Sequence, residues 1–284
     1  MTPTPTVALL GTGIMGAGMT RNIAGAGLPI RVWNRRRDRA EALADVATVA
    51  GSVSEAVDGA DVVLTMLWDT DAVAATMEKA GGHLAADAVW LQQSTVGVEG
   101  CARLQEQADD LGVTFVDAPV LGTRKPAQDG ALVVLASGPE SVRPILTPIF
   151  DAVGRRTLWV GDAGNGSRLK LVVNAWVATM LEGVAESMAL ARDLGLDPAL
   201  FLEAVGGSAM DSPYIQLKGK NMLTGQLEPA FALAGALKDV DLILAAAEDS
   251  GTELGLMPGI RAHLARAVDA GHGDLDMAAT YLEH

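Results

Sequence analysis

Cysteine is nearly absent from this chain. Its 284 residues include one, Cys101, so no disulfide can form within the chain, and a reducing compartment is expected. No histidine lies near Cys101 in the sequence, which favours a small helical residue over a catalytic thiol. Histidine is also sparse. The four histidines, at 83, 263, 272 and 284, show no metal-ligand spacing, so the sequence predicts no metal site.

Long apolar runs are absent as well. No stretch reaches the roughly 18 consecutive apolar residues of a transmembrane helix, and the run at 7–10 is too short for a signal peptide. The net charge of −14 predicts a surface that repels nucleic acid and anionic membranes. We therefore expect a cytoplasmic globular protein whose ligands are small molecules rather than nucleic acid or membrane.

Glycines form the first motif. Residues 7–16 read VALLGTGIMG, an apolar strand that runs directly into Gly11, Gly13 and Gly16 and then into a helical pattern. In this order the first glycine makes a tight turn, the second lets the backbone approach a pyrophosphate, and the third lets the helix pack on the strand. The free N–H groups at the start of the helix favour the negative phosphates. The motif predicts a dinucleotide site.

The end of the next expected strand, 29–33, lacks an acidic residue. NAD-binding proteins place an acid there for the ribose 2′-hydroxyl, whereas NADP-binding proteins place a basic residue for the 2′-phosphate. This chain has Asn34, Arg35, Arg36 and Arg37, and the planar fork of arginine suits phosphate oxygens. We expect NADP(H), bound with the help of Asn34, Arg35 and Arg36. The alternative for one or two of these arginines is a solvated cluster that opens a surface helix.

Strand and helix patterns alternate through the first half of the chain. Further strands are expected at 47–50, 61–67, 88–91, 114–116 and 132–136. This alternation predicts an α/β fold with a doubly wound parallel sheet, a Rossmann domain over 1–162, whose ligand crevice lies at the carboxyl ends of the strands. The remainder, 163–284, predicts an all-helical substrate and dimerisation domain that starts with a long interdomain helix at about 166–194.

Two polar residues interrupt the apolar surface of that long helix. Lys170 and Asn174 are four residues apart and share one face. A buried lysine is costly unless it is paired or lines a cavity, and desolvation lowers a lysine pKa toward the range useful for proton transfer. The alternative is a lysine that extends to solvent, and the helix pattern alone leaves both open. The outer face around Trp176 and Met180 predicts contact with a second subunit.

Several motifs, in order along nearly the whole chain, resemble those of the β-hydroxyacid dehydrogenases, a family that includes 3-hydroxyisobutyrate dehydrogenases and semialdehyde reductases. They are GTGIMG at 11–16, QSTV at 93–96, DAPVLGTRKPAQDGAL at 117–132, GNGSRLKLVVN at 164–174, and Phe231 with Lys238 and Asp239. The KPAQDG stretch, together with Asn34 and Arg35, is most similar to the NADPH-dependent glyoxylate/succinic semialdehyde reductase branch.

The resemblance implies hydride transfer between a nicotinamide and a carbonyl carbon, with Lys170 as general acid or base and Asn174 orienting Lys170 or the substrate oxygen. It implies dimers or tetramers. The substrate contacts that it implies are Ser94, Thr95, Leu121, Gly122, Thr123, Phe231 and Asp239. The implied cofactor contacts are Gly11, Gly13, Ile14, Met15, Gly16, Asn34, Arg35, Arg36, Met66, Leu67, Thr95 and Lys238.

One position departs from the family pattern. The family usually has Pro-Val-Ser-Gly where this chain has Pro119, Val120, Leu121 and Gly122. The missing hydroxyl makes the expected pocket narrower and more apolar, so the substrate stays open. Two alternatives remain: an imine reductase of the same fold, which Lys170 disfavours, and a catalytically silent NADP-binding regulatory protein, in which the lysine would be expected to be lost.

Overall fold

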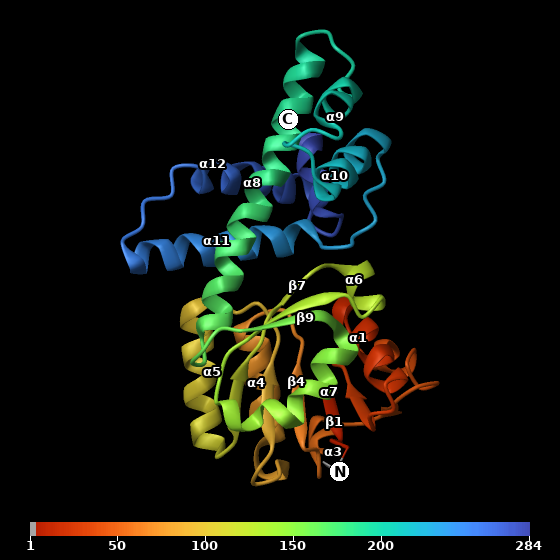
Figure 1. Ribbon diagram of the computed structural model, residues 1–284, viewed down its shortest axis with the longest axis vertical. Helices are drawn as coiled ribbons and strands as arrows, with labels where there is room; N and C mark the ends of the chain where they lie inside the picture. The colour runs from red at the N-terminus through yellow and green to blue at the C-terminus, as the bar shows by residue number, and fades with distance from the viewer. Residues whose placement is uncertain (1–3) are drawn as a thin grey trace. The chain divides into compact units, whose positions relative to one another are not determined.

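A computed structural model describes residues 4–284, and the chain in it divides into two compact units, one that ends at Lys170 and one that starts at Leu171 (Figure 1). The strands, all in the first unit, are β1 (Val7–Leu10), β2 (Ile30–Trp33), β3 (Thr48–Val49), β4 (Val62–Thr65), β5 (Val89–Gln92), β6 (Thr114–Asp117), β7 (Val120–Leu121), β8 (Leu132–Ala136) and β9 (Gly154–Trp159).

The first unit also contains α1 (Ile14–Gly25), α2 (Arg37–Glu41), α3 (Val53–Val57), α4 (Thr70–Ala80), η1 (Gly81–His83), α5 (Gly97–Leu111), α6 (Arg124–Gln128), η2 (Glu140–Val142) and α7 (Arg143–Val153). Helix α8 (Asn165–Asp193) begins in the first unit and continues in the second. The second unit then has α9 (Ala199–Val205), α10 (Pro213–Thr224), α11 (Leu233–Ser250), α12 (Met257–Ala267), η3 (Val268–His272) and η4 (Met277–Glu283).

The main sheet of the first unit has six parallel strands in the order β3-β2-β1-β4-β5-β6. Both faces of β1 are buried, since Val7 and Leu9 join a core with α1 and α7, while Ala8 and Leu10 join a core with α3, α4 and α5. Strands covered on both sides are apolar throughout, which is why the sequence shows runs rather than alternation. The expected doubly wound fold is confirmed. Its chain order reverses between β1 and β4, where such sheets bind ligands.

The expected strand at 132–136 forms but lies in a separate three-stranded sheet, β7-β8-β9, where β8 is antiparallel to β7 and parallel to β9. Its expected place in the large parallel sheet was wrong. The chain between β6 and β8 contains only a two-residue strand and the five-residue α6. Strand β7 in this link pairs with β8 in antiparallel fashion, and β9 covers the other edge of β8, so β8 is paired on both sides outside the main sheet.

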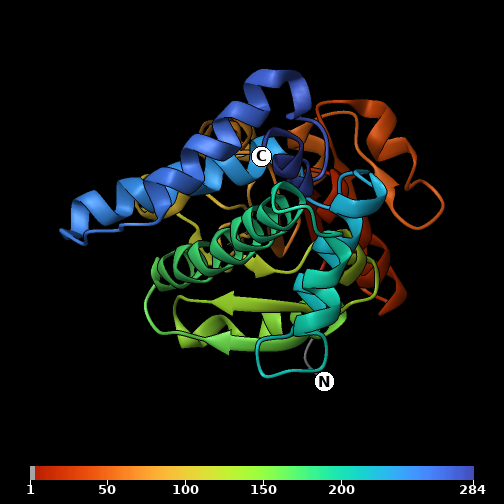
Figure 2. The ribbon, with the colours of Figure 1, turned by 90° about the horizontal axis from the view of Figure 1, so that it is seen from above.

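The second unit is helical, with α11 and α12 side by side (Figure 1 and Figure 2). Pro213 occupies the first turn of α10 behind its cap Ser212, and Gly251 ends α11 in a left-handed conformation. A buried ion pair joins Lys218 of α10 to Asp276 at 2.6 Å. No helix within residues 4–284 combines the length and the apolar character needed to cross a bilayer.

Candidate active site

The glycine loop follows β1, and two of its glycines are fixed by close packing. Gly11 has φ +111°, and a Cβ there would collide with the Met66 carbonyl oxygen, while a Cβ at Gly16 would collide with the Gly11 carbonyl oxygen. At Gly13, by contrast, a Cβ would meet nothing within 4 Å. Gly13 also caps α1 without a side-chain hydrogen bond. The backbone at Gly13 therefore faces open space at the N-terminus of α1, which is the setting that a pyrophosphate requires.

The arginines that follow β2 differ in the contacts that they make. Asn34 accepts a 3.2 Å hydrogen bond from the Thr12 N–H and donates one of 2.9 Å to the Arg36 carbonyl, so it joins the glycine loop to the arginine turn. Arg36 pairs with Asp38 and Arg37 with Glu41, both on the surface. Arg35 is exposed and forms no ion pair with any residue in 4–284. It is the guanidinium in this turn that remains available to a ligand.

The ends of β4 and β5 meet through Ser94, the residue next to Thr95. The Ser94 hydroxyl accepts a 2.8 Å hydrogen bond from the Leu67 N–H and lies 3.4 Å from the Thr65 carbonyl oxygen. Because Ser94 is 1% exposed, its side chain fixes the backbone at Met66 and Leu67 rather than extending into solvent. The Ser94 hydroxyl therefore links the ends of β4 and β5.

Two polar side chains at these strand ends are buried without protein partners. Both side-chain atoms of Gln93, and the Thr12 hydroxyl, form no hydrogen bond within the described residues 4–284. Gln93 is 1% exposed and Thr12 3%. A buried unpaired amide costs about 1–3 kcal/mol, so such groups call for a ligand or a water. They lie after β5 and β1, at the carboxyl ends of strands, where a dinucleotide fits.

The start of α8 is held by Asp117, which ends β6 and is fully buried. Its carboxylate accepts hydrogen bonds from the Ser167 N–H at 2.7 Å and the Ser167 hydroxyl at 2.8 Å. Ser137 lies 3.3 Å from the same carboxylate and accepts from the Gly166 N–H at 2.9 Å. Burial raises the pKa of Asp117, and the hydrogen bonds from Ser167 oppose that shift. Asp117 thus anchors the first turn of α8, one turn before Lys170.

Cys101 packs in α5 as the sequence predicts. It is buried, and desolvation raises the pKa of its thiol, with the Asp117 charge acting in the same direction. A thiol that stays protonated is a poor nucleophile, which agrees with a packing role for Cys101.

Lys170 is 9% exposed, and its ammonium donates a 2.8 Å hydrogen bond to the Val120 carbonyl of β7. The residues that follow Val120 form the turn that the sequence singles out. Leu121 is half-buried, and Thr123 precedes α6. Gly122 has φ +127°, and a Cβ there would collide with the Pro126 and Leu132 side chains. The first unit therefore brings the Lys170 ammonium to the 121–123 turn, although 50 residues separate Lys170 from Val120.

In the second unit, Asn174 and Asp239 form a polar cluster. The Asn174 amide donates a 2.7 Å hydrogen bond to the Asp239 carboxylate, and Lys238 pairs with that carboxylate at 2.8 Å. Asp239 is 4% exposed. Phe231 lies just before α11, where its N–H donates to Asp276 at 3.3 Å. Asn174, Lys238 and Asp239 are thus brought together, and Phe231 is held in place by a different carboxylate.

Comparison with known proteins identifies the family. Residues 6–161 match the family model described as the NAD binding domain of 6-phosphogluconate dehydrogenase, and residues 164–282 match that described as NAD-binding of NADP-dependent 3-hydroxyisobutyrate dehydrogenase. The chain belongs to the β-hydroxyacid dehydrogenase family. It is therefore an NAD(P)-binding oxidoreductase, and the resemblance seen in the sequence motifs is confirmed.

Individual relatives agree with this assignment. The chain is 31% identical over 277 residues to glyoxylate/succinic semialdehyde reductase 1 of Arabidopsis thaliana, with 96% of each chain covered. It is 33% identical over 249 residues to the chloroplastic reductase 2 of the same plant, covering 86% of this chain and 70% of the relative. A solved Mycobacterium tuberculosis 3-hydroxyisobutyrate dehydrogenase with L-serine superposes with a TM-score of 0.88 at 27% identity, covering 99% of both chains.

The sequence does not reveal which residues hold Lys170 in position. It also does not reveal that the Gln93 side-chain amide lacks a partner within residues 4–284. Asp117 begins the 117–132 motif, but its buried partners Ser137 and Ser167 lie 20 and 50 residues away. Gln93 belongs to the 93–96 segment, and nothing local shows that its amide is left without a partner. The usable signal for Asp117 is a carboxylate at the end of an apolar strand, a position where a buried acid is uncommon.

Proposed function

We propose that this protein is an NADPH-dependent reductase of small carboxylated aldehydes or oxoacids, which also runs in reverse on the hydroxyacids, with Lys170 as general acid and base. One observation carries the proposal. The Lys170 ammonium is nearly fully buried and bonded to the Val120 carbonyl, beside the 121–123 turn. A buried lysine whose ammonium is held beside a glycine turn is suited to proton transfer.

The residues present fit a dinucleotide. The open space at Gly13 would admit the pyrophosphate to the N-terminus of α1. The Thr12 hydroxyl and the Gln93 amide, which find no partner within residues 4–284, would gain one. Arg35 would contact the 2′-phosphate of NADPH, with Asn34 holding the turn that presents it. Ile14, Met15, Met66, Leu67, Thr95 and Lys238 are the further cofactor contacts that we propose.

The dinucleotide held by these residues would supply the hydride that the carbonyl carbon of the substrate accepts. Lys170 donates a proton to the substrate oxygen as it gains negative charge, and accepts that proton in the reverse reaction. The Val120 carbonyl keeps the ammonium oriented without neutralising its charge. Asn174, one turn further along α8, orients the substrate oxygen, and Asp239 holds the Asn174 amide in place. Ser94 and Thr95, with the backbone at Gly122 and Thr123, would hold the substrate carboxylate, and Leu121 and Phe231 would be its apolar contacts.

We also propose that the protein is a homo-oligomer. On α8, Val172 is 67% exposed and Trp176 is 61% exposed, and Met180 lies one turn beyond Trp176. Large apolar side chains gathered on one helix favour contact with another subunit.

A substrate screen tests the proposed activity. The full chain would be mixed with NADPH and, in turn, succinic semialdehyde, glyoxylate, a longer branched oxoacid and a cyclic imine, and the loss of reduced nicotinamide followed. We expect turnover with one or more of the carboxylated carbonyl compounds. Turnover with the cyclic imine alone would support an imine reductase instead, and no turnover with any compound would support a silent NADP-binding protein.

A further inference from the structure

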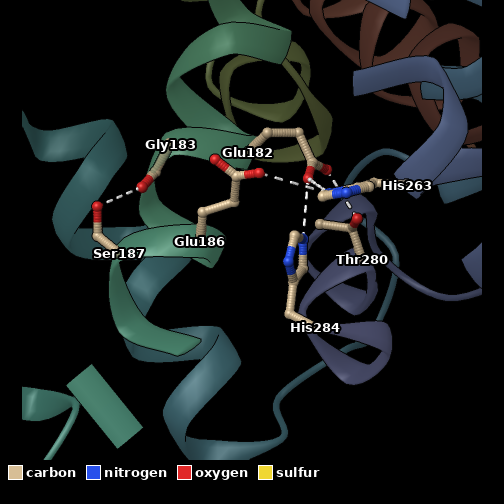
Figure 3. Close-up of polar contacts among 7 residues, drawn as sticks. All are labelled: Glu182, Gly183, Glu186, Ser187, His263, Thr280 and His284. Atoms are coloured by element: carbon tan, nitrogen blue, oxygen red, sulfur yellow. Dashed lines mark hydrogen bonds and ion pairs between the residues drawn. The ribbon is translucent and has the colours of Figure 1, made fainter. Parts of the chain in front are cut away.

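Three metal-ligand side chains converge inside the second unit. Glu182 projects from α8, His263 from α12, and His284 follows η4 (Figure 3). The three ligand atoms lie within 4.8 Å of one another. The Glu182 Oε2 atom is 3.3 Å from His263 Nδ1 and 3.0 Å from His284 Nε2. Two imidazole nitrogens from different segments thus point at one carboxylate oxygen.

These spacings match the geometry of a coordinated ion. Zinc binds imidazole nitrogen and carboxylate oxygen at about 2.0–2.2 Å in tetrahedral sites, which puts neighbouring ligand atoms about 3.3–3.6 Å apart. The separation of Glu182 Oε2 from His263 Nδ1, 3.3 Å, lies in that range, and its separation from His284 Nε2, 3.0 Å, is slightly shorter. The His263 and His284 rings meet edge to face, with their centroids 4.4 Å apart, rather than stacking face to face. The three ligand atoms are thus gathered closely enough for one ion to contact all of them.

The charge around Glu182 also calls for a cation. Its side chain is 4% exposed, and its partners are His263, His284 and Thr280, with no lysine or arginine of residues 4–284 paired to it. Glu186, one turn further along α8, has a carboxylate oxygen 3.9 Å from His263 Nδ1 and adds a second negative charge (Figure 3). A buried carboxylate is costly without compensation. A divalent cation would compensate it.

The surroundings orient the ligands as they do in known metal sites. The Thr280 hydroxyl donates a 2.7 Å hydrogen bond to Glu182 Oε1, which leaves Oε2 for the imidazoles. Arg192 donates a 2.9 Å hydrogen bond to the His284 carbonyl and holds that residue beside α8. The His263 side chain is 27% exposed, so one side of the cluster is open to an entering ion.

We propose that Glu182, His263 and His284 bind one divalent transition metal of the zinc class, with the Glu186 carboxylate or water as the fourth ligand. Mixed imidazole and carboxylate donors suit zinc better than calcium or magnesium. The bound ion would tie α8, α12 and the segment after η4 together. The sequence predicts no metal site because the two histidines lie 81 and 102 residues from Glu182, far outside any ligand-spacing motif.

Zinc titration of the chelator-treated full chain, with no affinity tag, tests the proposal. The variant is His263→Gln, which keeps the size of the side chain, and the matched control is His272→Gln. His272 has nearly the same side-chain exposure, 28%, but pairs with Glu283 outside the cluster. We expect the wild type and His272→Gln to bind one zinc ion per chain in competition with a chromophoric chelator, and His263→Gln to bind it at least about tenfold more weakly.

Two further measurements keep the test independent of any folding defect in the variant. Zinc in excess over the dissociation constant is expected to raise the Tm of the wild type and of His272→Gln, but not that of His263→Gln. Cobalt added to the wild type is expected to give the strong visible absorption of a four-coordinate ion. Unchanged Tm and weak cobalt absorption in the wild type, or equal zinc binding by His263→Gln, would overturn the proposal. A wild-type Tm that responds to pH and not to zinc would mean that protons on the histidines compensate Glu182, and would overturn it as well.

Discussion

Lys170 donates a 2.8 Å hydrogen bond to the backbone carbonyl of Val120, and this contact joins the start of α8 to the strand before the 121–123 turn. A carbonyl acceptor fixes the direction of the ammonium while leaving its charge in place. Asp117 holds the same helix start through Ser167. The position of Lys170 therefore rests on two strands, β6 and β7, in addition to its own helix.

The proton-transfer role of Lys170 predicts a large loss of turnover on its removal. For Lys170→Ala we expect kcat to fall by about 10²–10⁴-fold, the usual contribution of a general acid, with NADPH affinity little changed. The matched control is Arg168→Ala, which removes an exposed cation on the same helix that bonds to Asn165. Steady-state kinetics and cofactor titration measure both. Near-normal turnover in Lys170→Ala would show that the lysine is only structural.

The available guanidinium of Arg35 predicts a preference for NADPH over NADH. We expect NADPH to bind more tightly by about 1–3 kcal/mol, the value of a charge-assisted contact, and Arg35→Ala to reduce that difference. The control is Arg37→Ala, which breaks only the surface pair with Glu41. It is expected to leave the difference between NADPH and NADH affinity unchanged. Fluorescence titration of both cofactors supplies the affinities. Equal affinities in the wild type would contradict the assignment.

Leu121 predicts a shift in substrate preference. A leucine in place of a hydroxyl removes a hydrogen-bond partner and adds methylenes, each worth up to about 0.8 kcal/mol when buried against a ligand. We expect weak activity on glyoxylate and a higher kcat/KM for longer or branched carbonyl substrates. Leu121→Ser is expected to raise kcat/KM for short polar semialdehydes relative to kcat/KM for the longer or branched substrates. If the wild type prefers glyoxylate and the variant has the same ratio of kcat/KM values for the two kinds of substrate, the Leu121 side chain does not face the substrate.

The raised pKa of Asp117 predicts a pH-dependent cost in stability. The folded chain holds the Asp117 proton more tightly than the unfolded chain, whose pKa is about 3.9. The contribution of this group is therefore complete below the unfolded pKa and is lost as pH rises through the folded pKa. The amide introduced by Asp117→Asn does not titrate, so this variant is the reference. The unfolding free energy of the wild type minus that of the variant, from urea melts, is expected to decrease as pH rises. A difference that stays constant with pH, or increases, contradicts the burial argument.

The exposed face of α8 predicts association. We expect light scattering at micromolar concentration to show a dimer or tetramer, and Trp176→Glu to shift the population toward the monomer, because a charge would then be buried at the contact. Circular dichroism of the variant checks that it remains folded. A wild-type monomer at that concentration would refute the assignment.

The sequence by itself determined the parts of this protein that depend on neighbouring residues. The apolar runs and the glycine loop predict β1, α1 and the long helix, because buried strands, tight turns and helices each impose local residue requirements. The order of the motifs also identified the family. The strand at 132–136 was assigned to the wrong sheet, since its partners are β7 and β9, and no pattern within the strand itself records which strands pair with it.

Only the tertiary structure decided which polar groups meet. Asn34, Arg35 and Arg36 are alike in the sequence as phosphate donors, but the fold uses Asn34 and Arg36 in local contacts and leaves Arg35 available. The burial of Lys170 against Val120 and the convergence of His263 and His284 on Glu182 join residues 50 to 102 positions apart. Hydrophobic periodicity reports which face of an element is buried, whereas the partner of a buried polar group depends on how distant elements pack, and no local pattern records that.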